Sequence, residues 1–188
     1  RGDIVKRSHP FEGIVPNHLT GDDPLSVVEI AGLPLDLMVA GHVTVTRAIG
    51  STLANLFVEP SLREHLLDPA LAPKAIEEIL RLESPAQGLF RVTTRAAELG
   101  GATIPAGARV MAHFASANRD GCVFADPDAY RPERGDIGKH LAFGKGIHFC
   151  IGAPLGRLEL RVALPMLLRR LPGLRPGAGD PAREPVFF

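Results

Sequence analysis

The sequence lacks an excess of charge of either sign. Lys and Arg total 21, as do Asp and Glu, so no net field favours nucleic acid or an acidic lipid surface. It also lacks an uninterrupted apolar run near the ~20 residues that span a bilayer. The most apolar segment, residues 33–57, is broken by Asp36, His42 and Arg47, and the opening RGDIVKRSHPFEG has no signal-peptide core. We therefore expect a cytoplasmic protein that binds neither nucleic acid nor membrane.

Cysteine is scarce as well. Only Cys122 and Cys150 are present, and their surroundings differ. A reducing compartment disfavours a bridge between them, so each is considered alone. Cys122 lies in the turn-rich NRDGCVFADP without a companion ligand nearby, and we expect it to be a small packing or surface residue.

The remaining composition is that of a globular protein. A chain of 188 residues with 45% hydrophobic and 22% charged residues is long enough to bury a core in a single domain. After a polar lead-in over residues 1–32, the periodicity predicts a buried central helix over 33–57, with Pro34 near its start. A short helix capped by Ser61 follows, and then a helix over 73–83 that ends before Pro85.

From about Phe90 the pattern changes. Short extended runs between Val92 and Phe114, divided by GG and PAG, predict a small antiparallel sheet. Residues 118–142 show little regular periodicity, and a loop of that length is usually functional. A helix is expected over 153–170, with a kink or break at Pro165. The predicted fold class is mainly α with a small antiparallel β part (α+β).

The segment FGKGIHFCIG, residues 143–152, places Cys150 just before the last helix. Its glycines, Gly144, Gly146 and Gly152, let the backbone turn sharply and approach a flat ligand. The helix N-terminus stabilises a thiolate, which is either a nucleophile or a metal ligand. His148 could serve a nucleophile as base, whereas zinc would need further ligands at CxxC or HxxxH spacings that the sequence lacks. A single axial thiolate beneath a porphyrin needs neither a nearby base nor further protein ligands.

This segment resembles the haem-binding signature of the cytochromes P450, F-G-x-G-x-[HR]-x-C-x-G, at every defined position. The resemblance implies a partial P450 fold that holds the haem-proximal half of a longer chain. It implies that Cys150 is the proximal thiolate ligand of haem b, that Phe143 packs under the ring near the sulfur, and that Gly144 and Gly152 shape the loop.

Two further segments resemble the family's conserved brace. Glu78 and Arg81 in EEILR match E-x-x-R, and an arginine of DPDAYRPERGD would complete the brace. We favour Arg134 and keep Arg131 as the alternative, since Gly135 replaces the usual aromatic residue. The other interpretation of the Glu–Arg pair is an exposed ion pair on a solvated helix face.

The resemblance also assigns contacts to the haem propionates. Arg91, His140 and His148 occupy the corresponding positions. Individually, each could instead be a solvated charge or a hydrogen-bonded core histidine.

On the central helix, VAGHVTVT resembles the distal oxygen-binding pattern. Ala40 and Gly41 would open space above the iron, and Thr44 would steady bound dioxygen. Val43 replaces the family's acid and cannot relay a proton, so reaction with dioxygen should be slow or poorly coupled. Val39 and Val43, with the segment from Pro85 through Phe90, would line the substrate site.

Three functions therefore compete. The first is a monooxygenase that inserts one atom of dioxygen into a small organic substrate, with electrons from a ferredoxin- or flavodoxin-type partner. The second is a peroxide-using or oxidative-coupling enzyme, and the third is a truncated, non-catalytic haem-binding chain. A basic surface that could receive an acidic redox partner comprises Lys139, Lys145, Arg157 and Arg161, although a merely solvated face is equally consistent with the sequence.

Overall fold

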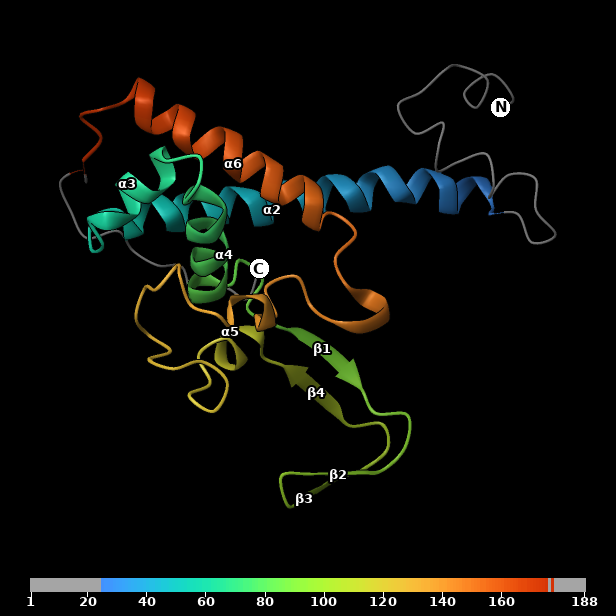
Figure 1. Cartoon of the computed structure of the whole chain (residues 1–188). Coiled ribbons are helices and arrows are strands. Elements are labelled where there is room, and N and C mark those ends of the chain that lie inside the picture. The colour runs from blue at the N-terminus through green and yellow to red at the C-terminus, as the bar shows by residue number, and fades with distance from the viewer. Residues whose placement is uncertain (1–24, 176, 178–188) are drawn as a thin grey trace. The chain divides into compact units, whose positions relative to one another are not determined.

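The computed structural model describes residues 25–175 and residue 177 (Figure 1). The chain divides into two units, Arg1–His42 and Val43–Phe188, which are described separately. Most of the predicted lead-in lies outside the described residues.

The first long helix, α2 (Val27–Asn55), begins six residues before the predicted start at residue 33 and crosses the unit boundary. Ser26 and Glu29 explain the early start. The Glu29 amide donates to Ser26 Oγ (3.2 Å) and the Ser26 amide donates to Glu29 Oε2 (2.7 Å), a reciprocal capping box that satisfies two helix-end donors. Pro34 therefore lies inside the helix and not near its start.

The prediction that this helix is buried is wrong for the described residues. Only Ala48 and Thr52 of α2 are buried, whereas Val27 and Val28 are 72% and 80% exposed. A helix that is apolar on all sides needs partners on all sides, and the described residues cover only part of it. By length and composition α2 could also cross a membrane, but core helices of soluble proteins pass the same test.

The core of the second unit lies where three helices meet: α3 (Ser61–Leu67), α4 (Ala72–Glu83) and α6 (Ala153–Arg170). Leucines four residues apart on α6 place one stripe against α3 and α4, and each fully buried leucine contributes about 1.5–3 kcal/mol. The buried core side chains of these helices include Leu62, Leu66, Ile76, Ile79, Leu80, Leu160, Leu164 and Leu168.

Two helix details differ from the predictions. Pro60, not Ser61, is the N-cap of α3, and the Ser61 hydroxyl donates to Glu59 Oε1 (2.6 Å). Helix α6 is not broken at Pro165, which lies in its buried stripe, and a kink there remains a prediction. Helix α4 ends at Glu83, before Pro85 as predicted, and its C-cap Ser84 adopts the left-handed conformation (φ 39°).

Within residues 25–175, the β structure consists of two antiparallel pairs. Strand β1 (Leu89–Val92) pairs with β4 (Arg109–Ala112), and β2 (Ala97–Leu99) pairs with β3 (Ala102–Ile104). Phe114 was expected in an extended run but begins the short helix α5 (Phe114–Ala117), where His113 Nδ1 accepts from the Ser116 amide (3.1 Å). The predicted class, mainly α with a small antiparallel β part, is confirmed.

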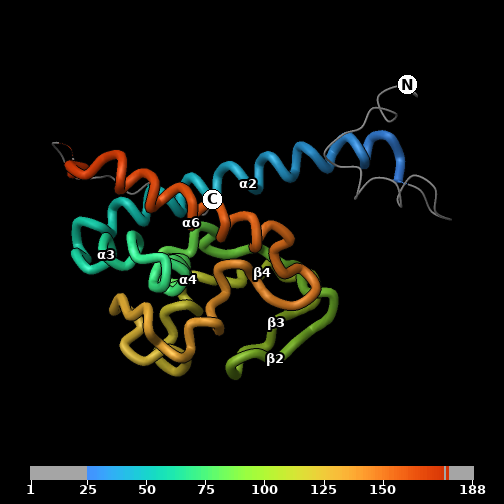
Figure 2. Tube along the Cα trace, turned by 45° about the horizontal axis from the view of Figure 1, so that its top comes forward, coloured from blue at the N-terminus to red at the C-terminus, as the bar shows by residue number. Residues whose placement is uncertain are grey.

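Between α5 and α6 the chain follows an irregular path, yellow to orange in Figure 2. The predicted loop over 118–142 contains one 3₁₀ turn, η1 (Ile137–Lys139), which contacts α4. The cysteine loop, residues 143–152, contains a second, η2 (Gly146–His148), and α6 follows directly.

Candidate functional site

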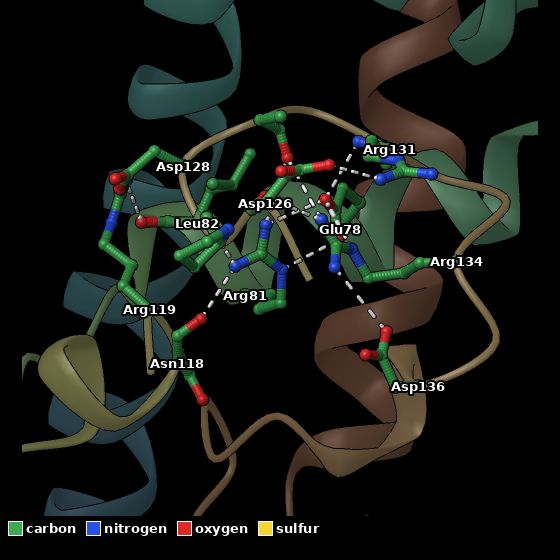
Figure 3. A network of polar contacts seen from close by, with 12 residues as sticks. Glu78, Arg81, Leu82, Asn118, Arg119, Asp126, Asp128, Arg131, Arg134 and Asp136 are labelled. Atoms are coloured by element: carbon green, nitrogen blue, oxygen red, sulfur yellow. Dashed lines mark hydrogen bonds and ion pairs between the residues drawn. The ribbon is translucent and has the colours of Figure 1, made fainter. Parts of the chain in front are cut away.

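Glu78 and Arg81 form a fully buried ion pair on α4 (Figure 3). Arg81 Nε donates to Glu78 Oε2 at 2.9 Å and its Nη2 donates to Oε1 at 2.8 Å. Both side chains are 0% exposed, so the alternative of a solvated surface pair does not apply. Two-point charge-assisted contacts of this kind fix the direction of both side chains.

Arg134 is the loop arginine whose side chain reaches this pair. Its Nε donates to Glu78 Oε1 at 3.0 Å, and its side chain is 4% exposed. Arg131 contributes only its backbone amide to the same oxygen (2.9 Å), while its guanidinium pairs with Asp126 in solvent. Figure 3 shows Glu78 between Arg81 and Arg134.

The two arginines hold the irregular segment through its carbonyls. Arg81 Nη1 donates to the carbonyls of Asn118 and Pro127, both at 2.7 Å. The Nη2 atoms of Arg81 and Arg134 both donate to the Ala129 carbonyl, at 3.3 and 3.2 Å. A segment with little regular structure is thus fixed to α4 by side-chain hydrogen bonds, which satisfy its buried carbonyls.

Asn118 was not anticipated from the sequence. It is fully buried, its Nδ2 donates to Ser84 Oγ (2.8 Å), and its Oδ1 accepts from the Leu141 amide (2.6 Å). It therefore links the end of α4 to the residues that lead into the cysteine loop. In the sequence, Asn118 is marked only as an amide residue after a run of small residues. That pattern is too common to predict a structural role.

The cysteine loop is closed by its own backbone. The Cys150 amide donates to the Phe143 carbonyl (2.9 Å), and the Ala153 amide, at the start of α6, donates to the Cys150 carbonyl (3.2 Å). Gly144 and Gly146 adopt positive φ values of 70° and 80°, where a side chain would be strained. This turn leaves the Cys150 side chain exposed at the N-terminus of α6.

The surroundings of Cys150 fit a haem. Ile147, Phe149 and Ile151 are 96%, 50% and 84% exposed, so apolar side chains available for a flat ligand adjoin the thiol in sequence. Within the part of the chain that the structure describes, no group of three His, Cys, Asp or Glu residues could hold a metal ion. A group that brings its other iron ligands with it, and takes one sulfur from the protein, matches this donor set.

A second carboxylate, Glu77, lies beside the first and was also missed. Its Oε1 accepts from Arg157 Nε (2.6 Å), and its Oε2 accepts from Arg157 Nη2 and lies near His140 Nε2 (both 2.9 Å). Burial raises the pKa of Glu77, but hydrogen bonds from Arg157 and His140 and the charge of Arg157 outweigh it and hold the pKa at about 2. The sequence feature that could have pointed to Glu77 is its place directly before Glu78 in EEILR.

These contacts alter two predictions. Arg157 is not a free charge of the predicted basic surface, because Glu77 pairs with it. Both ring nitrogens of His140 have protein partners: Nδ1 accepts from the Ala142 amide (3.2 Å), which leaves Nε2–H to donate to Glu77. This ring matches the hydrogen-bonded core histidine that the sequence left open.

The other predicted residues are located as follows. Arg91 is exposed on β1 and donates to the Phe90 carbonyl (2.8 Å); His148 is exposed in η2. Ala40 and Gly41 lie on α2 in the first unit, and Thr44 lies on α2 in the second. A distal site formed by these α2 residues and the cysteine loop remains a prediction.

Comparison with known proteins agrees with this geometry. The profile of the family "Cytochrome P450" matches residues 70–177. Cytochrome P450 107B1 of Saccharopolyspora erythraea is 43% identical over 178 residues, which cover 92% of this chain and 44% of that protein. Mycinamicin IV hydroxylase/epoxidase of Micromonospora griseorubida is 40% identical over 184 residues, which cover 94% of this chain and 46% of that protein.

The ligand-free structure of cytochrome P450 TbtJ1 superposes with a TM-score of 0.85 at 41% identity, and covers 94% of this chain and 46% of that one. The chain thus spans somewhat less than half the length of these relatives. The family match covers the E-x-x-R helix, the irregular segment and the cysteine loop. The chain belongs to the cytochrome P450 family.

Proposed function

We propose that the chain is the haem-binding part of a haem-thiolate monooxygenase. The observation that carries the proposal is the exposed Cys150 thiol, held at the start of α6 by a loop that closes on the Phe143 carbonyl. The helix N-terminus favours the thiolate form of such a cysteine. The buried Glu78–Arg81–Arg134 brace holds the segment that leads into this loop.

Cys150 would hold the iron of haem b, with Phe143 beside the sulfur. A haem ligated by thiolate supplies oxygen activation, because electron donation from sulfur favours O–O cleavage and insertion of one oxygen atom into substrate. Arg91 and His148 are exposed and available to the propionates, whereas both nitrogens of His140 are engaged within the protein. We therefore assign the propionate contacts to Arg91 and His148.

On α2, Ala40 and Gly41 would leave room for dioxygen and Thr44 would donate a hydrogen bond to it. Val43 stands where the family pattern has an acid. Glu29 does not replace that acid, because it caps the start of α2, where hydrogen bonds from Ser26 lower its pKa. Protons would therefore come from substrate or water.

The substrate is a small organic molecule, as the name of the mycinamicin relative indicates for that protein. Electrons would come from a ferredoxin- or flavodoxin-type partner in the cytoplasm. Lys139, Lys145 and Arg161 are exposed and would face an acidic partner. Arg157 takes no part in this surface, because it pairs with Glu77.

Dioxygen uptake tests the proposal against its alternatives. With haem, a reductase system and substrate, the monooxygenase consumes dioxygen and gives a product that contains one of its oxygen atoms. An oxidative-coupling enzyme consumes dioxygen but gives a product without added oxygen, and a peroxide-using enzyme turns over only with added peroxide. A chain that takes up no stoichiometric haem would support the non-catalytic alternative.

Replacement of Val43 tests the missing acid. Val43→Asp should raise the ratio of product to dioxygen consumed by about tenfold, less than the roughly 10²–10⁴-fold that a positioned acid or base adds to a rate, because this ratio cannot exceed one. Val43→Asn, which has a similar size and no acid, is the matched control. An equal effect of both variants, or no effect of either, would contradict proton supply as the limiting step.

A further inference from the structure

The two ends of the cysteine loop meet at one carboxylate, that of Glu77. His140 precedes the loop and Arg157 follows it on α6. Glu77 accepts hydrogen bonds from both, at 2.9 Å from His140 Nε2 and 2.6 Å from Arg157 Nε. The carboxylate thus ties the entrance and the exit of the loop to α4, the helix that also carries the Glu78–Arg81 pair.

These contacts are partly shielded from water. The side chains of Glu77, Arg157 and His140 are 20%, 28% and 4% exposed. Arg157 makes a two-point contact, through Nε and Nη2, which fixes the plane of its guanidinium. Such a pair is more restrictive than a solvated single-point ion pair.

The fixed guanidinium in turn contacts the loop. Arg157 Cζ lies 4.3 Å from the centroid of the Phe143 ring, within the range of a cation–π interaction. The Phe143 carbonyl accepts the hydrogen bond from the Cys150 amide (2.9 Å). A chain of direct contacts therefore runs from Glu77 through Arg157 and Phe143 to the backbone of Cys150.

We propose that Glu77 is a positioning residue, which fixes the two ends of the cysteine loop through His140 and Arg157 and thereby sets the place of the Cys150 backbone. It is separate from the Glu78 brace, since Glu78 pairs with Arg81 and Arg134, whose guanidinium groups hold the irregular segment, whereas Glu77 holds the loop ends. That the loop presents Cys150 to a haem rests on the proposed function, whereas the positioning of the loop by Glu77 does not.

Amide hydrogen exchange in the haem-free chain tests this directly. Glu77→Gln keeps the size of the side chain but loses the charge and one acceptor oxygen. Loss of a charge-assisted contact should speed exchange of the Cys150 amide by about tenfold relative to the amides of α3. Asp128→Asn, which removes an ion pair with Arg119 remote from the loop, is the control and should leave the Cys150 amide unchanged.

Two further variants separate the contact of Glu77 with Arg157 from its contact with His140. Arg157→Met should accelerate exchange at Cys150 nearly as much as Glu77→Gln, and the double variant should add little. His140→Gln should produce a smaller increase, because Arg157 still holds Phe143. If Glu77→Gln does not fold, these variants provide the same comparison.

Equal acceleration of exchange at all amides, in α3 as at Cys150, would mean that Glu77 only stabilises the whole fold, and would overturn the proposal. An unchanged exchange rate of the Cys150 amide would also overturn it. Added haemin then separates the two claims. A wild-type chain that binds no haem contradicts the proposed function while the exchange result stands. In a chain that binds haem, Glu77→Gln should broaden the Soret band and should leave the sulfur ligand in place.

Discussion

At the scale of residues, two adjacent glutamates of α4 hold different parts of the chain between α5 and α6. Glu78 is fully buried and receives Arg81 and Arg134, while Glu77 is partly exposed and receives Arg157 and His140. On an α-helix, adjacent residues point about 100° apart, so one turn can serve two directions. This arrangement requires both glutamates, and neither replaces the other.

Arg134 and Arg131 provide a matched pair for the brace. Arg134→Gln should lower the free energy of unfolding by about 3 kcal/mol, because it leaves the buried Glu78 carboxylate short of a partner. Arg131→Gln should cost less than about 1 kcal/mol, since its exposed side chain pairs only with Asp126 and its backbone amide remains on Glu78. Urea denaturation of the two variants measures the difference, and equal losses would contradict the assignment of Arg134.

At the scale of elements, α4 connects α6, the irregular segment and the cysteine loop. Besides their apolar core, α4 and α6 share the ion pair between Glu77 and Arg157, which depends on the charge of Glu77, whose pKa is held at about 2 against an ordinary value of 4.5. A lowered folded-state pKa stabilises the protein above the unfolded-state pKa, and that contribution is lost as pH falls toward the folded value.

The stability of the wild-type chain should therefore fall more steeply than that of Glu77→Gln between pH 5 and pH 2. Since Glu77 is partly exposed and screened by solvent, the difference between the two proteins should shrink by about 1–2 kcal/mol over that range. Urea denaturation at several pH values measures it. A difference that stays constant with pH would show that Glu77 carries no linked charge.

Local signals predicted some elements well and others poorly. The helix over 73–83 is α4, because Ile76, Ile79 and Leu80 form one apolar face and Pro85 prevents its continuation. The start of α2 was missed because its capping box, Ser26 and Glu29, lies in a segment that resembled a polar lead-in. A single capping box can extend a helix past the end of its apolar pattern.

Contacts between residues far apart in the chain were the hardest to predict from the sequence. The pairing of Glu78 with Arg81 follows from helix spacing, but its pairing with Arg134 was expected only from the family resemblance. Nothing local indicated that Glu77 would pair with Arg157, eighty residues later. The same limit explains why Arg157 was expected on a basic surface. Charge alone does not show which way an arginine points.

At the scale of the whole molecule, the chain carries the cysteine loop, its supports and the helix α2, within less than half the length of its relatives. Apolar side chains that are exposed in the described residues gather on α2 and around the cysteine loop, among them Val28, Met38, Ile147 and Ile151. Exposed apolar surface of this kind is typical of a site that a ligand or further protein covers. Haem would cover that part of it that lies around the cysteine loop.

The most direct test of the account is the absorption spectrum of the reduced, haem-reconstituted chain under carbon monoxide, recorded for the wild type and for Cys150→Ala. Ligation by Cys150 should give a strongly red-shifted Soret band for the wild type, which is the signature of a thiolate ligand, and its loss in the variant. A band that is not shifted in the wild type, or a shifted band that survives in Cys150→Ala, would contradict ligation by Cys150.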